Sequence, residues 1–416
     1  MVHRELAVKH YARSATLLGA ALISSVLVGH LACGSGGGIP ALDSEGTVGR
    51  YTSITIGSDG LGLISYLDSG PGLLLGGTAT SVEAEFVYGS PLESGSGSLK
   101  VAHCSNADCT IATTAILDAN GEVGRDTSIT VGSDGLGIIS YFDVGNRDLK
   151  VAHCSNTECS SAAMSTVDSE GDVGRFSSIA VGSDGLPFIS YWDIGKSTLK
   201  VAHCEDLACS TATTATLDED GRVGMYTSVA IGTDGLPLIS YFDIANKDLK
   251  IAHCTDAECS DGTTATLDSE GNVGQYTSIA IGSDGLGLIS YLDGTDSDLK
   301  VAHCLDVECS RAELVTIDLE GKFGRYSSVT IGGDGLALVS YWDAEKGDLK
   351  VAHCDDMACS SASTLAVDTH SNTGWYTSIA TGNDGLGLIS YFDFAELDLK
   401  VFHCPNATCD RDEAQR

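Results

Sequence analysis

Polar and apolar residues alternate along the chain in short runs that end at turns, and residues 223–268 show the order of the predicted elements. A β-branched run over residues 227–232 stops at Thr-Asp-Gly, and an apolar and aromatic run follows over residues 236–243. A third run covers residues 249–254, and a threonine-rich run covers residues 263–268. Asp-Gly between such runs is typical of a tight hairpin. The pattern predicts four short antiparallel strands, which we name a to d.

This stretch is repeated along the chain. From residue 118 onward the pattern recurs every 50 residues, so that six aspartates are equivalent: Asp118, Asp168, Asp218, Asp268, Asp318 and Asp368. Counting the strand b tyrosines gives seven copies: Tyr66, Tyr141, Tyr191, Tyr241, Tyr291, Tyr341 and Tyr391. A period of this length, made of strands and turns, is typical of propeller blades. We predict an all-β, seven-bladed β-propeller with four antiparallel strands per blade of about 50 residues; an open solenoid is the alternative.

The two ends of the repeat array predict how the ring closes. The last copy stops before a fourth strand, while residues 39–43 match the end of that strand. We expect residues 39–43 to pair with the last blade, which removes the open edge that a linear array would expose. The propeller is therefore expected to span residues 39–416, with an insertion at residues 69–93 in the b–c loop of the first blade.

Residues 1–32 have the pattern of an export signal. Three basic residues lie within residues 1–13, and residues 14–32 are apolar and uncharged. The sequence His-Leu-Ala-Cys followed by Gly-Ser-Gly-Gly-Gly resembles a bacterial lipoprotein signal, although His30 stands where leucine is usual. The resemblance implies a lipidated Cys33, a tether over residues 33–38 and an outer-membrane or cell-surface location. An ordinary secretory signal or an uncleaved anchor helix is the alternative.

The remaining cysteines predict disulfides. They form seven pairs at the turn between strands c and d: Cys104/Cys109, Cys154/Cys159, Cys204/Cys209, Cys254/Cys259, Cys304/Cys309, Cys354/Cys359 and Cys404/Cys409. Since the two chain segments of a hairpin already lie side by side, local disulfides in an oxidising compartment are expected. Each closes a loop of about six residues and contributes about 2 kcal/mol. Zinc is the rival reading, but His253 and Cys254 are consecutive strand residues that point to opposite faces, so we expect no metal site.

Charge limits the partners. The formal net charge of the 416 residues is -34, which opposes binding to phosphate backbones and excludes nucleic acid as an expected partner. The turn sequences at residues 118–122 and 168–172 place oxygen ligands beside a glycine, so loop-bound calcium stays open although they fall short of a full calcium loop. No other cofactor is expected.

Each repeat carries polar residues that could be taken for catalytic groups. In the second copy these are Ser140, Tyr141, Asp143, Lys150 and His153. A nucleophile and its base act at one place on a substrate, whereas this set occurs around the whole ring. We therefore interpret it as a hydrogen-bond network that satisfies buried polar groups, with the aspartate capping the b–c turn and the lysine neutralising it.

Function requires asymmetry, and the copies differ at two places. The insertion contains an alternating stretch over residues 80–88, in which the candidate binding residues are Glu83, Glu85, Phe86 and Tyr88. The position after a repeated glycine reads Arg50, Arg125, Arg175, Met225, Gln275, Arg325 and Trp375. We place this position in the d–a loop at the channel mouth, on the same face as the insertion. The four arginines and the tryptophan are candidates for binding a carboxylate or sulfate; pairing of arginines with Glu122 and Asp172 is the alternative.

The repeat Ser-Asp-Gly-Leu-Pro-x-Ile-Ser-Tyr-x-Asp, followed by Leu-Lys-Val-Ala-His-Cys and a second cysteine, resembles secreted propeller repeats of predatory and soil bacteria. The resemblance covers residues 39–409. Sialidases are similar at the level of the fold only, because their Ser-x-Asp-x-Gly-x-x-Trp box is missing here.

Two functions are consistent with these features. The first is a non-enzymatic recognition or scaffold propeller, monomeric and held at the membrane by its lipid anchor, that binds an envelope protein or glycan through the insertion and the arginine-lined mouth. The alternative is a glycan hydrolase or lyase with a site in the same mouth. An enzyme of that class needs a pair of acids unique to one blade, and Glu83 and Glu85 are the only candidates found. A purely structural role in the envelope is a third possibility.

Overall fold

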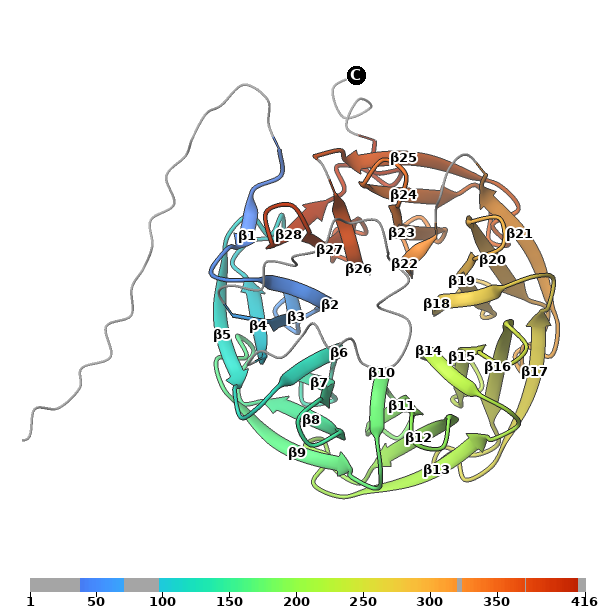
Figure 1. The fold of residues 1–416 in the computed structure, drawn as a ribbon. Coiled ribbons are helices and arrows are strands. Elements are labelled where there is room, and N and C mark those ends of the chain that lie inside the picture. The colour runs from blue at the N-terminus through green and yellow to red at the C-terminus, as the bar shows by residue number, and fades with distance from the viewer. Residues whose placement is uncertain (1–37, 71–96, 320–323, 371, 411–416) are drawn as a thin grey trace, which may run out of the picture. The chain divides into compact units, whose positions relative to one another are not determined.

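The computed structural model describes residues 38–70, 97–319, 324–370 and 372–410, and these form seven four-stranded antiparallel sheets without a helix (Figure 1). The seven-bladed propeller predicted from the repeats is confirmed. The predicted signal, Cys33 and its tether lie outside the described residues. So do the insertion candidates Glu83, Glu85, Phe86 and Tyr88.

The strands follow one another from the axis outwards, so that strand a is innermost and strand d outermost (Figure 1). The first three blades are β2 Val48–Ile56, β3 Gly62–Asp68, β4 Ser98–Cys104 and β5 Ala112–Asp118; β6 Val123–Val131, β7 Gly137–Asp143, β8 Asp148–Cys154 and β9 Ala162–Asp168; β10 Val173–Val181, β11 Pro187–Asp193, β12 Thr198–Cys204 and β13 Ala212–Asp218. The next three are β14 Val223–Ile231, β15 Pro237–Asp243, β16 Asp248–Cys254 and β17 Gly262–Asp268; β18 Val273–Ile281, β19 Gly287–Asp293, β20 Asp298–Cys304 and β21 Ala312–Asp318; β22 Arg325–Ile331, β23 Ala337–Asp343, β24 Asp348–Cys354 and β25 Ala362–Asp368. The seventh blade consists of β26 Thr373–Thr381, β27 Gly387–Asp393, β28 Asp398–His403 and β1 Ala41–Asp43.

The predicted ring closure is also confirmed. Strand β1 pairs antiparallel with β28, with Ala41 opposite Lys400 and Asp43 opposite Leu399. This closing strand has three residues, whereas the other outer strands have seven. Pro40 directly precedes it and has no backbone N–H to donate to the ladder, which accounts for the early end of the pairing.

The innermost strand starts earlier than its sequence indicated. Strand β14 begins at Val223, four residues before the predicted start at residue 227. Its first half contains a bulge, because Gly224 and Tyr226 both have positive φ and the register with β15 shifts on either side of Met225. Placing the arginine column in the d–a loop was therefore wrong. Its members lie in the bulged part of the inner strand, as Arg50 does opposite Leu67.

The apolar core lies between neighbouring blades. One buried cluster joins Phe188 and Leu199 of the third blade to Val223, Ile239 and Tyr241 of the fourth, and equivalent clusters follow around the ring. Because each cluster takes side chains from two sheets, no blade can bury its apolar face alone. This explains why the fold needs the complete ring.

Hydroxyl groups join the inner strands across each blade boundary. Ser140 Oγ lies 3.0 Å from Ser177 Oγ, and the backbone N–H of Ile179 donates to Ser128 Oγ at 3.1 Å. The a–b turns are joined as well, since Ser133 Oγ donates to the Gly185 carbonyl at 3.1 Å. The structural reading of the repeated serine is therefore confirmed.

The repeated tyrosine, lysine and aspartate form a second interblade link. Tyr141 donates to Asp118 Oδ2 at 2.8 Å, and Lys150 Nζ donates to the same oxygen at 2.6 Å. Burial raises the pKa of Asp118, but the hydrogen bonds from Lys150, the Asn120 backbone and Tyr141 outweigh it and hold that pKa below its usual value. The carboxylate at the end of one blade thus stays charged between two donors of the next.

The roles predicted for the other members of this set need one correction. Asp143 Oδ1 accepts the Asn146 backbone N–H at 2.9 Å, which confirms that it caps the b–c turn. Lys150, however, lies 3.8 Å from Asp143 and makes its shorter contact with Asp118. The prediction missed this partner because Asp118 belongs to the preceding sheet. His153 Nε2 lies 2.9 Å from Asp134 Oδ2.

All seven predicted disulfides are formed, each across its c–d turn: Cys104–Cys109, Cys154–Cys159, Cys204–Cys209, Cys254–Cys259, Cys304–Cys309, Cys354–Cys359 and Cys404–Cys409. The two sulfur atoms of each pair are therefore bonded to each other, as the disulfide interpretation predicts. Seven disulfides indicate an exported or extracellular protein. In the part of the chain that the structure describes, we find no helix able to cross a membrane.

Candidate binding site on the propeller axis

The predicted arginines do not form an open basic cluster. Arg50 and Arg125 are buried, and Arg125 Nη2 lies 3.7 Å from Glu122 Oε1, as the pairing alternative anticipated. Arg175 Nε donates to Asp126 Oδ2 at 2.6 Å. The other acid named in that alternative, Asp172, lies 3.7 Å from Arg147 instead. Arg325, the fourth arginine of the column, is the first residue of β22 and half-buried.

Trp375 is buried among other aromatic side chains. Its ring lies 4.5 Å from that of Trp342 and 4.9 Å from that of Phe394. The indole N–H donates to Asn372 Oδ1 at 2.9 Å. A ligand that approaches this face would therefore meet the edge of an aromatic cluster and not an isolated indole. Binding by the arginines and Trp375 remains a prediction.

The next column along the chain, which the sequence analysis passed over, surrounds the propeller axis. Its residues all have left-handed φ values between 50 and 56°, and we call them the axial ring: Tyr51, Asp126, Phe176, Tyr226, Tyr276, Tyr326 and Tyr376. This conformation costs a residue other than glycine roughly 1–2 kcal/mol. The bulge that imposes it turns each side chain toward the axis.

Six members of the axial ring are aromatic, and they stack around the axis. Five neighbouring pairs have ring centroids 4.5–4.8 Å apart and interplanar angles of 37–60°. At this separation two rings can lie face towards face, but there is no room for them side by side in one plane. Tyr226, Tyr276, Tyr326 and Tyr376 therefore each lie between two rings, whereas Phe176 and Tyr51, on either side of Asp126, each have one neighbour in the axial ring.

A cavity of about 170 Å³ lies inside the axial ring. Its wall also contains the residue that follows each ring member: Thr52, Thr127, Ser177, Thr227, Thr277, Ser327 and Thr377. These hydroxyls belong to the interblade links, as Thr127 Oγ1 does at 2.8 Å from Ser65 Oγ. Among all these lining residues only Asp126 carries a charge.

Asp126 breaks the aromatic ring, and Arg175 fills the space beside it. Asp126 Oδ2 accepts Arg175 Nε at 2.6 Å and the Phe176 backbone N–H at 3.1 Å. The guanidinium carbon lies 4.9 Å from the centre of the Phe176 ring and 5.6 Å from that of Phe142. Burial lowers the pKa of Arg175, but the Asp126 carboxylate more than compensates and raises it overall. A neutralised ion pair thus takes the seventh place in the stack.

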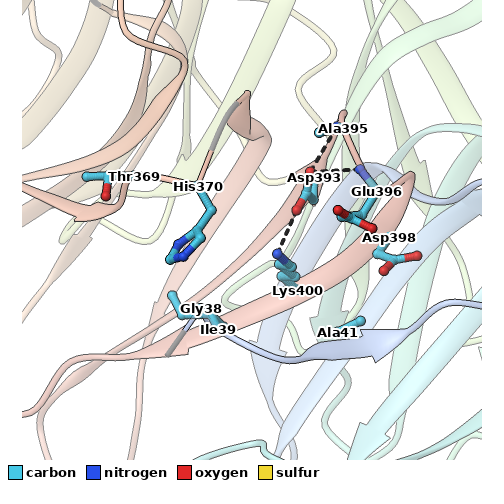
Figure 2. Close-up of a pocket in the computed structure, with 10 residues that line it drawn as sticks. All are labelled: Gly38, Ile39, Ala41, Thr369, His370, Asp393, Ala395, Glu396, Asp398 and Lys400. Atoms are coloured by element: carbon cyan, nitrogen blue, oxygen red, sulfur yellow. Dashed lines mark hydrogen bonds and ion pairs between the residues drawn. The ribbon is translucent and has the colours of Figure 1, made fainter. Parts of the chain in front are cut away.

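A second cavity, of about 530 Å³, lies where the ring closes, and we call it the closure cavity (Figure 2). Lys400 Nζ donates to Asp393 Oδ2 at 2.6 Å, although its equivalents in the other blades bind the aspartate of the preceding blade. Figure 2 shows Asp398 and Glu396 on the wall of this cavity. Burial and the charges of Asp393 and Glu396 raise the pKa of Asp398 to about 6. The sequence analysis missed this site because the closing strand comes from the other end of the chain.

The described residues contain no group of three or more histidine, cysteine or acidic side chains placed to hold a metal ion. The turn carboxylates considered for calcium have other partners. Asp118 Oδ1 accepts the Asn120 backbone N–H at 3.0 Å, and its Oδ2 is bound by Tyr141 and Lys150. Asp168 has the equivalent bonds with Glu170, Tyr191 and Lys200.

No protein-family model matches the chain, and no curated protein matches it. Solved structures with the same fold do. A protein of unknown function from Dyadobacter fermentans has a TM-score of 0.51 at 10% identity, covering 88% of this chain and 96% of its own. Hydrazine synthase of Kuenenia stuttgartiensis has a TM-score of 0.55 at 9% identity, covering 90% and 99%. The NanB sialidase of Streptococcus pneumoniae has a TM-score of 0.45 at 10% identity, covering 88% and 68%. At these identities the likeness to the first two structures shows the fold alone.

Proposed function

We propose that the protein is an exported, non-enzymatic recognition propeller that binds an envelope protein or glycan on the face where the axial ring opens. The observation that carries the proposal is which residues recur in every blade and which residues differ between blades. The groups suited to catalysis recur from blade to blade and are committed to interblade bonds, as Tyr141, Lys150 and Asp118 are. The arginine column and the axial ring, near the d–a and b–c turns, are two places where the blades differ, at Trp375 in the first and at Asp126 in the second.

The cellular location is part of the proposal. The disulfides support export, and the signal pattern before Cys33 supports a lipid anchor at the outer membrane. The strongly acidic composition is consistent with a soluble domain that does not adhere to anionic surfaces.

A specific observation favours the glycan hydrolase alternative, with its site in the closure cavity and not at the channel mouth. Asp398 has a pKa raised to about 6 and lies in the closure cavity near Glu396, which is the kind of environment that keeps a general acid protonated. Similar acid pairs recur in other blades, however, as Asp296 and Asp298 do in the fifth. Hydrolysis of a panel of chromogenic glycosides by the wild type and by Asp398→Asn decides the matter: turnover that the substitution abolishes would establish the enzyme.

The recognition function is tested by capture from an envelope extract and by a glycan panel. The mature protein is compared with a version lacking residues 69–93, whose removal restores the repeat pattern, and with Met357→Ser. Met357 lies exposed in a c–d turn, on the opposite face, and serves as the control. We expect specific capture by the wild type and the control and weaker capture by the deletion. Equal, non-specific recovery with all three proteins contradicts the proposal.

A further inference from the structure

The single break in the axial ring leaves two polar atoms facing the axial cavity. Within the described residues both hydrogen bonds to the Asp126 carboxylate go to Oδ2, so that Oδ1 has no hydrogen-bond partner among them although Asp126 is only 7% exposed. The neighbouring Tyr51 also lines the cavity, and its hydroxyl makes no hydrogen bond with the described residues. Asp126 Oδ1, a hydrogen-bond acceptor, and the Tyr51 hydroxyl, which can donate and accept, therefore lie on adjacent blades at the same level.

We propose that this break is a subsite for the terminal ring of a neutral saccharide, whose hydroxyl groups donate to Asp126 Oδ1 and accept from Tyr51. The inference rests on the proposed recognition function and narrows its ligand from an envelope protein or glycan to a neutral glycan end.

The electrostatics of the cavity favour a neutral ligand. Asp126 is the only charged residue in the wall, and Arg175 neutralises it from behind. A second cation would lie close to that guanidinium, and an anion would lie close to the carboxylate. Cation–π binding needs an accessible ring face. Four of the six rings lie between two neighbouring rings at 4.5–4.8 Å, and Phe176 also has the Arg175 guanidinium at 4.9 Å. Only Tyr51, with a single ring neighbour in the axial ring, has a face toward the break, and a cation there would lie close to Arg175. The hydroxyl groups of a neutral sugar both donate and accept hydrogen bonds, so they match Asp126 Oδ1 and the Tyr51 hydroxyl.

The size of the cavity favours one sugar ring. Its volume of about 170 Å³ is below the roughly 300 Å³ at which pockets begin to enclose drug-sized ligands. A single sugar ring therefore fits this volume, and the rest of a longer glycan would lie over the neighbouring turns. The wall is largely preorganised, since interblade hydrogen bonds hold the hydroxyl layer, as between Thr127 and Ser65.

The test is an array of neutral and acidic oligosaccharides, followed by calorimetry with the best neutral binder. Wild type is compared with Tyr51→Phe, Asp126→Asn and the matched control Tyr276→Phe, which makes the same change across the ring. Phe176 shows that the ring accepts phenylalanine at this position. Thermal unfolding and near-ultraviolet circular dichroism without saccharide show whether each variant is folded.

We expect three- to tenfold weaker binding for Tyr51→Phe, from loss of one neutral hydrogen bond, and less than twofold for Tyr276→Phe. For Asp126→Asn we expect a loss of more than tenfold, because the bond to a charged acceptor is lost. The inference is overturned if no neutral saccharide binds, or if the two tyrosine variants lose affinity equally. Capture of an envelope protein that is insensitive to all three substitutions overturns the saccharide subsite and leaves the recognition function standing. If neither saccharide nor extract component is captured, both fall.

Discussion

Replacing Lys200 by methionine removes the cation from one interblade link and keeps the length of the side chain. Lys200 Nζ donates to Asp168 Oδ2, and the two side chains are only 7% and 4% exposed. Removing one partner of a buried ion pair costs about 3–5 kcal/mol. Tyr191 at 2.6 Å and the Glu170 backbone at 3.0 Å still bind the carboxylate. We therefore expect the lower end, a loss of about 3 kcal/mol in the free energy of unfolding.

The assay is urea denaturation followed by circular dichroism with the disulfides intact, and Lys196→Met is the matched control. Lys196 lies exposed in the b–c turn of the same blade, so its replacement should change the free energy by less than about 0.5 kcal/mol. A loss below about 1 kcal/mol for Lys200→Met, or an equal loss for both variants, would refute a stabilising role for the interblade ion pair.

The pH dependence of the same variant tests the cause of the loss. Burial raises the pKa of Asp168, but the bonds from Lys200, Tyr191 and Glu170 outweigh it and hold the pKa below its usual value. The charged carboxylate therefore stabilises the fold above its unfolded pKa of about 3.9, and this contribution is lost as the pH falls through the lower folded value. The difference in free energy of unfolding between wild type and Lys200→Met should therefore become smaller below about pH 4. A difference that stays constant would indicate lost packing instead.

Three further predictions concern other parts of the fold. Replacing Cys254 and Cys259 together by serine should lower the free energy of unfolding by about 2 kcal/mol, measured by urea denaturation, and no change would show that the loop is equally ordered without the bond. Because the pKa of Asp398 is raised to about 6, its protonation stabilises the folded state below that value and the stabilisation is lost as the pH rises through it. The melting temperature should therefore increase as the pH is lowered from 7 to about 5, and Asp398→Asn should reduce the increase. Gly224 has a φ of 100°, and a Cβ there would lie 2.8 Å from the Leu199 backbone. Gly224→Ala should therefore lower the free energy of unfolding by more than about 2 kcal/mol, measured by thermal unfolding. An unchanged melting temperature would contradict the bulge.

The repeat made the architecture predictable. A fixed period brings equivalent residues to equivalent places, so that the seven sheets, the disulfides and the closure of the last blade by a strand from the other end of the chain, here Ala41–Asp43, could all be inferred. The start of the inner strand could not be inferred, because left-handed residues such as Tyr226 interrupt the β pattern without ending the strand. The arginine column was misplaced for that reason.

The axial ring was hidden by the same repetition. Tyrosine at five of its seven positions looks like part of the repeated core, and only the stacking distances reveal that these side chains meet at the axis. The available signal was Asp126, a charged residue in an otherwise aromatic column. Partners across blade boundaries, such as Arg175 with Asp126, depend on how neighbouring sheets are set against one another, and the sequence period does not contain that information.

The central claim is that the face carrying the axial ring is the recognition surface. Its most direct test is photo-cross-linking with benzoylphenylalanine placed at Tyr51 or, on the opposite face, at Met357, in the presence of envelope extract or oligosaccharides. We predict a discrete adduct from the protein with the probe at Tyr51 and none from the protein with the probe at Met357. Adducts formed only at Met357, or at neither position, would contradict the claim.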